Sequence, residues 1–317
     1  MLGSGLDLPA LAARQRASGP ALWDYDLTLG VLPPVLSLAR ATGATYVGAT
    51  GLITAAAVNE PRFDADPITH AVRGLLLEPQ ATYFGARSED VATSPWVLSS
   101  GLLNTAVTMD SPLRAADTVN RLGGGSQAYS AAQYSTVPTN ATLTQHWLVR
   151  NVDAVASRVS YRDNVTTVQI DMSITWASAT AGAAIASVAV STGAGVTCTA
   201  SGYWNYGGGW WLVWATFTTG ALNGANVLRF APAQTTIGRS VDVAAAWATY
   251  TDAPQSYTPT TTVPVTRDAD ALTLLDTSRA VEITYSPLAG GAAQTVQVAA
   301  GAQPGALYGR LTRVRQL

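Results

Sequence analysis

Lysine is absent from this chain of 317 residues, so all 18 basic residues are arginine. A GC-rich coding sequence explains this bias, and arginine is also suited to bidentate ion pairs at interfaces because its guanidinium is weakly hydrated. Both interpretations stay open, with the coding bias favoured. The formal net charge of −2 supplies no basic stripe for nucleic acid and no attraction to an anionic membrane, so we expect neither partner.

Cysteine and histidine are also scarce: Cys198 is the single cysteine, and His70 and His146 are the two histidines. An intrachain disulfide is therefore excluded, and a thiolate or multi-histidine metal site is not expected. Asp64 and Asp66 lack the further oxygen ligands of a calcium loop. We predict no metal and no cofactor.

Long apolar runs are missing as well. No segment reaches the roughly 18 residues of a membrane span, and residues 1–18 lack the continuous apolar core of a signal peptide. The sequence therefore predicts a soluble protein made in the cytoplasm. Charged residues make up only 12% and hydrophobic residues 48%, which favours tightly packed β-structure with many subunit contacts over a monomeric enzyme surface.

Aromatic residues, in contrast, are concentrated in residues 201–219, SGYWNYGGGWWLVWATFTT. From Trp210 to Thr218 the side chains alternate with a period of two, which is typical of a β-strand. The three glycines at 207–209 permit a tight turn because glycine accepts positive φ. This stretch predicts a hairpin whose second strand is buried on at least one face of a β-sandwich.

Further strand candidates are separated by Gly, Asn and Pro at the spacing of a sandwich or barrel. They are Thr118–Leu122, Gln145–Val149, Val165–Trp176, Ala184–Ser191, Val196–Ala200, Asn226–Ala231, Ser240–Tyr250, Leu272–Leu275, Ala280–Tyr285 and Thr295–Ala299. The tail from Tyr308 to Arg315 alternates basic and apolar residues. That pattern predicts an edge strand with arginine outward, which discourages uncontrolled pairing, or a strand that pairs with a neighbouring subunit.

Residues 1–38 are apolar and interrupted by proline. We expect a short helix ending near Gly19, followed by extended chain that Pro33 and Pro34 break. Two interpretations are equally open: a strand added to the main domain, or an arm that docks on a partner protein.

Several short segments carry a resemblance to a known class of proteins. They are Arg40-Ala41-Thr42, Ala44-Thr45-Tyr46-Val47, Pro61-Arg62-Phe63-Asp64, Asp66-Pro67, Arg73-Gly74-Leu75-Leu76-Leu77-Glu78, Ser256-Tyr257-Thr258-Pro259-Thr260 and Val265-Thr266-Arg267-Asp268-Ala269-Asp270. At this spacing they resemble segments of tailed-bacteriophage virion proteins of the head-spike and tail-fibre type. The resemblance implies a concanavalin-like or carbohydrate-binding-module-like sandwich between them.

We therefore predict an all-β fold: a jelly-roll-like antiparallel β-sandwich with an N-terminal extended arm and extra C-terminal strands. The expected organisation is a docking arm (1–38), a small β-rich connector (39–85), the sandwich (86–262) and C-terminal strands (263–317).

The tip of the aromatic hairpin is the candidate ligand site. Flat aromatic rings stack on the apolar face of a sugar while nearby polar groups bind its hydroxyls. Trp204, Asn205, Tyr206 and Trp210 are the predicted glycan-binding residues. Trp211, Trp214 and Phe217 are expected in the core on strand alternation, and core packing is an equal alternative for Trp204 and Tyr206.

Catalysis is not expected. The acidic cluster consists of Asp64, Asp66, Glu78, Glu89 and Asp90, and a glycosidase needs two carboxyl groups facing each other across a sugar. Asp66 precedes a proline and is expected to cap a turn, while Arg62 and Arg73 are expected to pair with the other acids. No nucleophile and base are recognisable, and His146 is expected to be structural.

These observations predict a virion structural protein, assembled in the cytoplasm of the host bacterium. It would form a homo-oligomer, with three copies expected, dock to other virion proteins through residues 1–38 and bind host surface glycans. The alternatives are a purely architectural capsid or tail protein and, third, a polysaccharide depolymerase.

Overall fold

The chain folds into β-structure throughout the part that the computed structural model describes, residues 22–98, 101–123, 131–135, 137–163, 169–193, 195–220, 226–233 and 238–317. These residues form 24 β-strands and one short 3-10 helix, with every strand pair antiparallel. The predicted all-β antiparallel fold is confirmed. None of the described residues belongs to a helix long and apolar enough to cross a membrane. The helix expected before Gly19 lies outside the described residues.

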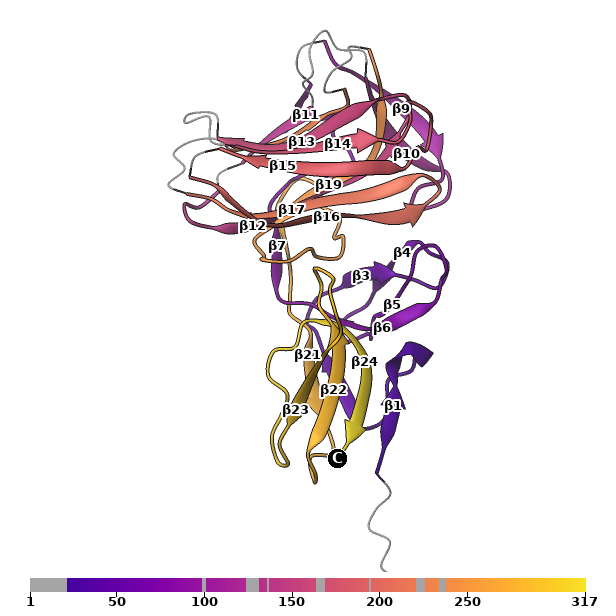
Figure 1. Ribbon diagram of the computed structural model, residues 1–317, viewed down its shortest axis with the longest axis vertical. Coiled ribbons are helices and arrows are strands. Elements are labelled where there is room, and N and C mark those ends of the chain that lie inside the picture. Colours follow the sequence, from indigo (N-terminus) through magenta and orange to yellow (C-terminus); the bar gives the residue numbers. More distant parts are fainter. Residues whose placement is uncertain are drawn as a thin grey trace, which may run out of the picture.

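A wide two-layer sandwich sits above a smaller, elongated module (Figure 1). The sheet farther from the small module, the distal sheet, has the order β15 (Ile185–Thr192), β14 (Gln169–Trp176), β13 (Ala156–Asp163), β18 (Asn226–Ala231), β11 (Ala131–Ser135) and β8 (Trp96–Leu98). The nearer sheet, the proximal sheet, has the order β16 (Thr197–Gly207), β17 (Trp210–Thr218), β12 (Thr142–Asn151), β19 (Val241–Thr249), β10 (Asp117–Gly123) and β9 (Leu103–Met109). The jelly-roll connectivity stays a prediction.

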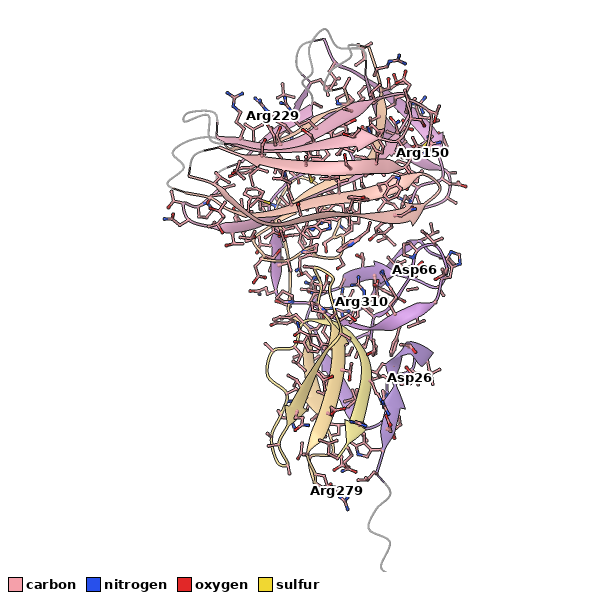
Figure 2. All side chains as sticks on the ribbon, viewed as in Figure 1. Asp26, Asp66, Arg150, Arg229, Arg279 and Arg310 are labelled. Atoms are coloured by element: carbon pink, nitrogen blue, oxygen red, sulfur yellow. The ribbon has the colours of Figure 1, made fainter. Side chains whose placement is uncertain are left out.

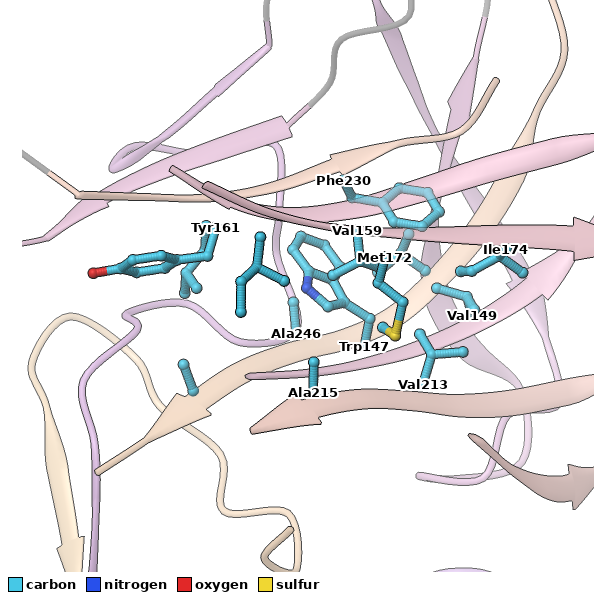
Figure 3. Close-up of a cluster of buried hydrophobic side chains, with 14 of the residues drawn as sticks. Trp147, Val149, Val159, Tyr161, Met172, Ile174, Val213, Ala215, Phe230 and Ala246 are labelled. Atoms are coloured by element: carbon cyan, nitrogen blue, oxygen red, sulfur yellow. The ribbon is translucent and has the colours of Figure 1, made fainter. Parts of the chain in front are cut away.

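The main core lies between these two sheets (Figure 3). Trp147 of β12 stands at its centre, with its ring stacked 5.3 Å from Phe230 and edge-on to Trp96 at 5.6 Å. Val213 and Phe217 of β17 point into the same core. Aromatic side chains bury large areas and prefer such offset and edge-to-face arrangements, so they hold the two layers in one register.

The proximal sheet is buried on its other face too. Every residue of β19, including the run Ala244–Ala246, is buried. A second cluster containing Leu148, Trp210 and Trp247 packs there against Tyr257 and the small module. A strand covered on both faces reads as a nearly continuous apolar run rather than an alternating one, which is what the sequence VDVAAAWAT shows.

The small module combines both ends of the described chain. Its main sheet has the order β23 (Gln294–Val298), β22 (Val281–Ser286), β24 (Gly309–Gln316), β6 (Val72–Leu77) and β5 (Phe63–Ala65), with β1 (Asp24–Asp26) paired to β24. Two pairs complete it, β2 (Leu36–Ala39) with β21 (Ala271–Leu274) and β3 (Ala44–Val47) with β4 (Ile53–Ala56). Between the two modules, β7 (Ala81–Tyr83) pairs with β20 (Val265–Arg267) and with β19.

The C-terminal tail is not an edge strand, so that expectation was wrong. β24 lies in the middle of its sheet, bonded to β22 on one side and to β6 and β1 on the other. Its alternating arginines are neutralised by acids on other strands of the same sheet: Arg310 pairs with Asp64 of β5, and Arg315 pairs with Glu282 of the adjacent β22 at 2.6 Å. Cross-strand pairs of opposite charge make an alternating basic strand compatible with a central position.

The segment 22–38 belongs to the small module's own sheets. β1 pairs with β24 and β2 with β21, and Leu27 and Leu36 are buried in the module's core. Of the two interpretations left open, the added strand describes these residues, although they join the small module rather than the sandwich. Residues 1–21 of the predicted docking arm lie outside the described residues.

Candidate ligand-binding groove

The aromatic hairpin is built as predicted. Gly207 of β16 pairs with Trp210 of β17, leaving Gly208 and Gly209 as a two-residue loop. Their φ angles of 58° and 81° lie in the left-handed region, which a two-residue hairpin of the I′ type requires. Gly209 also packs closely, because an added Cβ would come within 2.5 Å of the Cα of Gly182.

Trp210, one of the predicted glycan-binding residues, is covered by protein. Its side chain is 2% exposed, and its Nε1 donates a 2.9 Å hydrogen bond to the backbone oxygen of Asp110. Trp214 on the same face is also buried, as expected, and lies over Gly202, where an added Cβ would be 3.0 Å from the indole. Trp210 therefore ties the hairpin to the chain just after β9, while Trp214 packs against the neighbouring strand β16.

The other three predicted residues remain accessible. Trp204 is half-buried, with its ring centroid 5.7 Å from that of Trp214, and Asn205 is exposed. The neighbouring Tyr203 is 38% exposed, and its ring meets that of Trp211 edge-on at 5.7 Å. The Asn205 Oδ1 accepts a 2.8 Å hydrogen bond from the Gly207 backbone N–H, which fixes the approach to the turn. Tyr206 is half-buried against the small module.

A groove of about 260 Å³ lies between this strand and the small module. One wall is residues 203–206 of β16, and the other is formed by Asp66, Pro67, Ile68 and Arg73. A second hollow of about 380 Å³ on the other side of Tyr206 shares Pro67 and Ile68 and extends to His70, Ser111 and Trp210. Figure 2 places Asp66 and Arg310 in this region, where the small module faces the sandwich. The second wall comes from a segment over a hundred residues away, which sequence reasoning did not connect to the hairpin.

The groove carries a fixed charge and a neutral phenol. The Asp66 carboxylate accepts hydrogen bonds from the backbone N–H of Thr69 at 2.8 Å and of Ile68 at 2.9 Å, and the Thr69 bond is the main reason that its pKa is lowered. Burial raises the pKa of Tyr206 to about 12, and the Asp64 carboxylate acts in the same direction. At neutral pH the groove therefore offers the Asp66 carboxylate and a phenol that both donates and accepts hydrogen bonds. It also offers the half-exposed Arg73 guanidinium, which is already paired with Asp64.

Asp64 lies behind this wall and is enclosed. Its Oδ2 receives Arg73 at 2.7 Å and Arg310, and its Oδ1 accepts a 3.0 Å hydrogen bond from the Val47 backbone N–H. Asp66 caps its turn as expected, and the expected pairing of Arg73 with an acid is observed. Asp64 and Asp66 thus serve different structural roles rather than facing each other across a cleft.

The remaining acids of the cluster are also engaged. Glu89 accepts hydrogen bonds from the Tyr257 hydroxyl at 2.7 Å and from Arg114 at 2.6 Å, and Asp90 caps the turn at Ala92 and Thr93. In the described part of the chain, no three His, Cys, Asp or Glu side chains gather in a way that would hold a metal ion.

Glu78 belongs to a buried ion-pair network at the base of the sandwich. Arg62 contacts both Glu78, at 2.6 Å, and Asp270, while Arg40 reaches Asp270 at 3.0 Å and Arg267 reaches Glu78 at 3.6 Å. All five side chains are at most 1% exposed. Buried charges are tolerated only when paired and hydrogen-bonded, so this network requires that the four segments carrying these five residues be in place together.

The environment of Glu78 favours its charged form. Burial by itself raises the pKa of this carboxyl, but the guanidinium groups of Arg267 and Arg62, with the Ser256 hydroxyl, outweigh burial and lower it to about 2. Ser256 binds Glu78 twice, through its backbone N–H at 2.6 Å and its hydroxyl at 2.7 Å. The network therefore also links the segment around Ser256, which follows the last strand of the sandwich, to the segment around Glu78, which precedes its first strand.

His146 is structural, as expected. It is buried, stacked on Trp247 with ring centroids 4.8 Å apart, and its Nε2 accepts a 3.2 Å hydrogen bond from the Gln255 backbone N–H. Burial lowers its pKa to about 3, so the ring is neutral at physiological pH. The ring contributes packing between the sandwich and the segment that crosses its base.

No family model matches the chain, and no curated protein matches it.

Proposed function

We propose that this protein is a structural component of a tailed-phage virion, assembled in the host cytoplasm, whose sandwich presents the groove beside Trp204 to glycans on the host surface. The groove is the observation that carries the binding role. It combines two accessible aromatic rings, an exposed amide and a carboxylate, contributed by two modules that the ion-pair network holds together. Sugar sites need this combination of apolar surface with a few fixed polar groups.

The virion role is supported by where the resembling segments lie. Four of those segments, well separated in the sequence, carry Arg40, Arg62, Glu78 and the pair Arg267 and Asp270. Their side chains meet in one buried cluster. A set of separated segments that shares one network behaves as a unit, since removing one member leaves a buried charge unpaired. The resembling segments thus meet at the junction between the small module and the sandwich, and in the sequence they lie on both sides of the sandwich.

The mechanism that follows is multivalent adhesion. A groove of this size contacts only part of a polysaccharide, so each copy binds weakly. Several copies fixed on one particle raise the overall affinity, because every event after the first takes place at high effective concentration. Residues 1–38 would supply contacts to other virion proteins; within 22–38, which belong to the small module's sheets, exposed side chains such as Leu29 and Val31 would make them.

A purely architectural role is the second candidate. It is favoured by the burial of Trp210 and Trp214, because these two rings of the aromatic hairpin are used for packing and are not available to a ligand. In that case the groove would have no ligand, and the hairpin would serve only to join the two modules.

Titration of purified full-length protein with host-surface oligosaccharides distinguishes the glycan-binding role from the purely architectural role. We expect binding that Trp204→Ala weakens at least tenfold. Ile68→Arg should weaken it as well, because Ile68 is 54% exposed on the opposite wall and its replacement obstructs the groove without removing core packing. Trp23→Ala is the matched control, since Trp23 is half-buried in the small module, where it contacts Tyr25 and Asp276. Absence of binding, or unchanged binding by both groove variants, would favour the architectural role.

A further inference from the structure

One lateral edge of the sandwich has no partner within the described chain. β16 bonds only to β17, and β15 bonds only to β14, so each is the last strand of its sheet. The two strands follow one another in sequence and lie one above the other at the same side of the sandwich (Figure 1). The outer N–H and C=O groups of β16, 11 residues long, and of β15, eight residues long, have no backbone partner among the described residues.

This edge is also free of charge. Between Asp171 and Arg229 there is no Asp, Glu, Lys, Arg or His, although charged residues make up 12% of the chain. Folded proteins protect exposed edges with charged side chains, proline, bulges or very short strands. Neither strand contains proline, neither is short, and the two bulges of β16 leave Ala200–Asn205 regular between them.

The exposed side chains of the edge are small or hydroxylated, apart from Tyr203 and Asn205. Those of β16 and β15 are Thr197, Thr199, Ser201, Tyr203, Asn205, Ala186, Ser187, Ala189, Ser191 and Thr192. Small side chains let another backbone approach to the distance of a strand pair, and threonine and serine pair favourably across strands. Tyr203, 38% exposed, would gain cover from such a neighbour.

We infer that this edge binds the same edge of a second copy of the chain, with β16 pairing to β16. The chemistry of the surface determines the occupant: unpaired backbone donors and acceptors along a strand are satisfied by another extended strand. A partner bearing charges opposite this stretch would lose their solvation without compensation. The chain's own edge lacks charge throughout, so two like edges meet without such a cost.

A contact between like edges is two-fold, because the same patch is used on both sides. It therefore joins copies in pairs, unlike the three copies expected from the sequence. The groove lies beside the same strand, on the face toward the small module, so two grooves would be held at a fixed separation. Self-association is measured without glycan, so its outcome is independent of the proposed adhesion.

Sedimentation velocity and light scattering on the full-length chain test the inference. We expect twice the chain mass of 32.8 kDa, and a fall to the single-chain mass for Ser201→Lys, which places like charges across the β16 pair. Ser187→Lys on β15 is a second edge variant, should the first fold poorly. Thr175→Lys is the matched control, because Thr175 is exposed on β14, an interior strand.

Three results would overturn the inference. They are a wild-type chain that stays single at micromolar concentration, edge variants that remain paired, and loss of pairing in Thr105→Lys. Thr105 is exposed on β9, at the opposite edge of the proximal sheet, so that last result would show pairing of unlike edges.

Discussion

Arg62 donates a 2.6 Å hydrogen bond to the Glu78 carboxylate where both side chains are shielded from solvent. The pair sits where the chain passes between the small module and the sandwich, beside Ser256 and Asp270 from its distant C-terminal third. Its main consequence is specificity of assembly. A buried ion pair contributes little net stability, yet removing one partner is costly because the other charge remains buried.

Glu78→Gln should therefore destabilise the protein strongly. The substitution removes the charge that faces Arg62 and Arg267 while keeping the side chain's size. We expect a loss of about 3–5 kcal/mol in the free energy of unfolding, measured by urea denaturation. Glu282→Gln is the matched control: Glu282 pairs with the more exposed Arg315, and a change below about 1 kcal/mol is expected. Equal losses for both variants would contradict the account.

Stability should fall as the pH drops below 6.5, and His146 is the reason. The unfolded chain binds a proton on this histidine near its ordinary pKa of 6.5, whereas burial lowers the folded-state pKa to about 3. Below pH 6.5 the unfolded state thus holds more protons, and the free energy of unfolding decreases by up to about 1.4 kcal/mol per pH unit. Denaturation curves between pH 7 and pH 5 measure this slope. His146→Gln should flatten it, while His70→Gln, on an exposed turn, should not.

A steeper loss is expected below pH 4.5, where Glu78 acts in addition. Its pKa is lowered from 4.5 to about 2 in the folded state, so its contribution is fully present above pH 4.5 and disappears as the pH falls toward 2. In Glu78→Gln this second loss should be smaller while the His146 slope remains, because other carboxyl groups with lowered pKa values, such as Asp66, still contribute. A variant that keeps both slopes would show that other groups control acid unfolding.

Gly209→Ala should destabilise the aromatic hairpin. The residue has a φ of 81°, and an added Cβ would lie 2.5 Å from the Cα of Gly182. Gly301→Ala is the control, because Gly301 has a φ of 77° but no atom within 4 Å of the added Cβ. The control should lose about 1 kcal/mol from the backbone conformation alone, and Gly209→Ala at least about 1 kcal/mol more. The midpoint of urea unfolding measures both; equal values would mean that the contact with Gly182 yields easily.

Alternation and turn chemistry were enough to predict much of the sandwich. Trp210–Thr218 was assigned correctly, because its side chains alternate between two faces and the glycines before it permit a tight turn. The predicted strand at Ser240–Tyr250 matches β19 for the same reason. In contrast, β9 and β13 were missed, since the exposed threonines of β9 and the serines and arginines of β13 give weak apolar periodicity.

What could not be predicted depends on distant parts of the chain meeting. The alternating arginines of β24 led to the prediction of an exposed edge strand, because their partners Asp24, Asp64 and Glu282 lie on three other segments. The second wall of the groove, around Ile68, has no signal linking it to the hairpin for the same reason. The burial of Trp210 follows from its packing in the second hydrophobic cluster and from its hydrogen bond to the Asp110 backbone oxygen, which strand alternation does not reveal.

The most direct test of the central claim is to find the chain in a phage particle. Particles purified from lysed host cells should contain it in fixed proportion to the capsid or tail proteins, as measured by mass spectrometry. Imaging of the same particles should place a β-sandwich of this shape at their surface, with the groove beside Trp204 facing outward. Its absence from purified particles, with the protein recovered free in the lysate, would contradict the account.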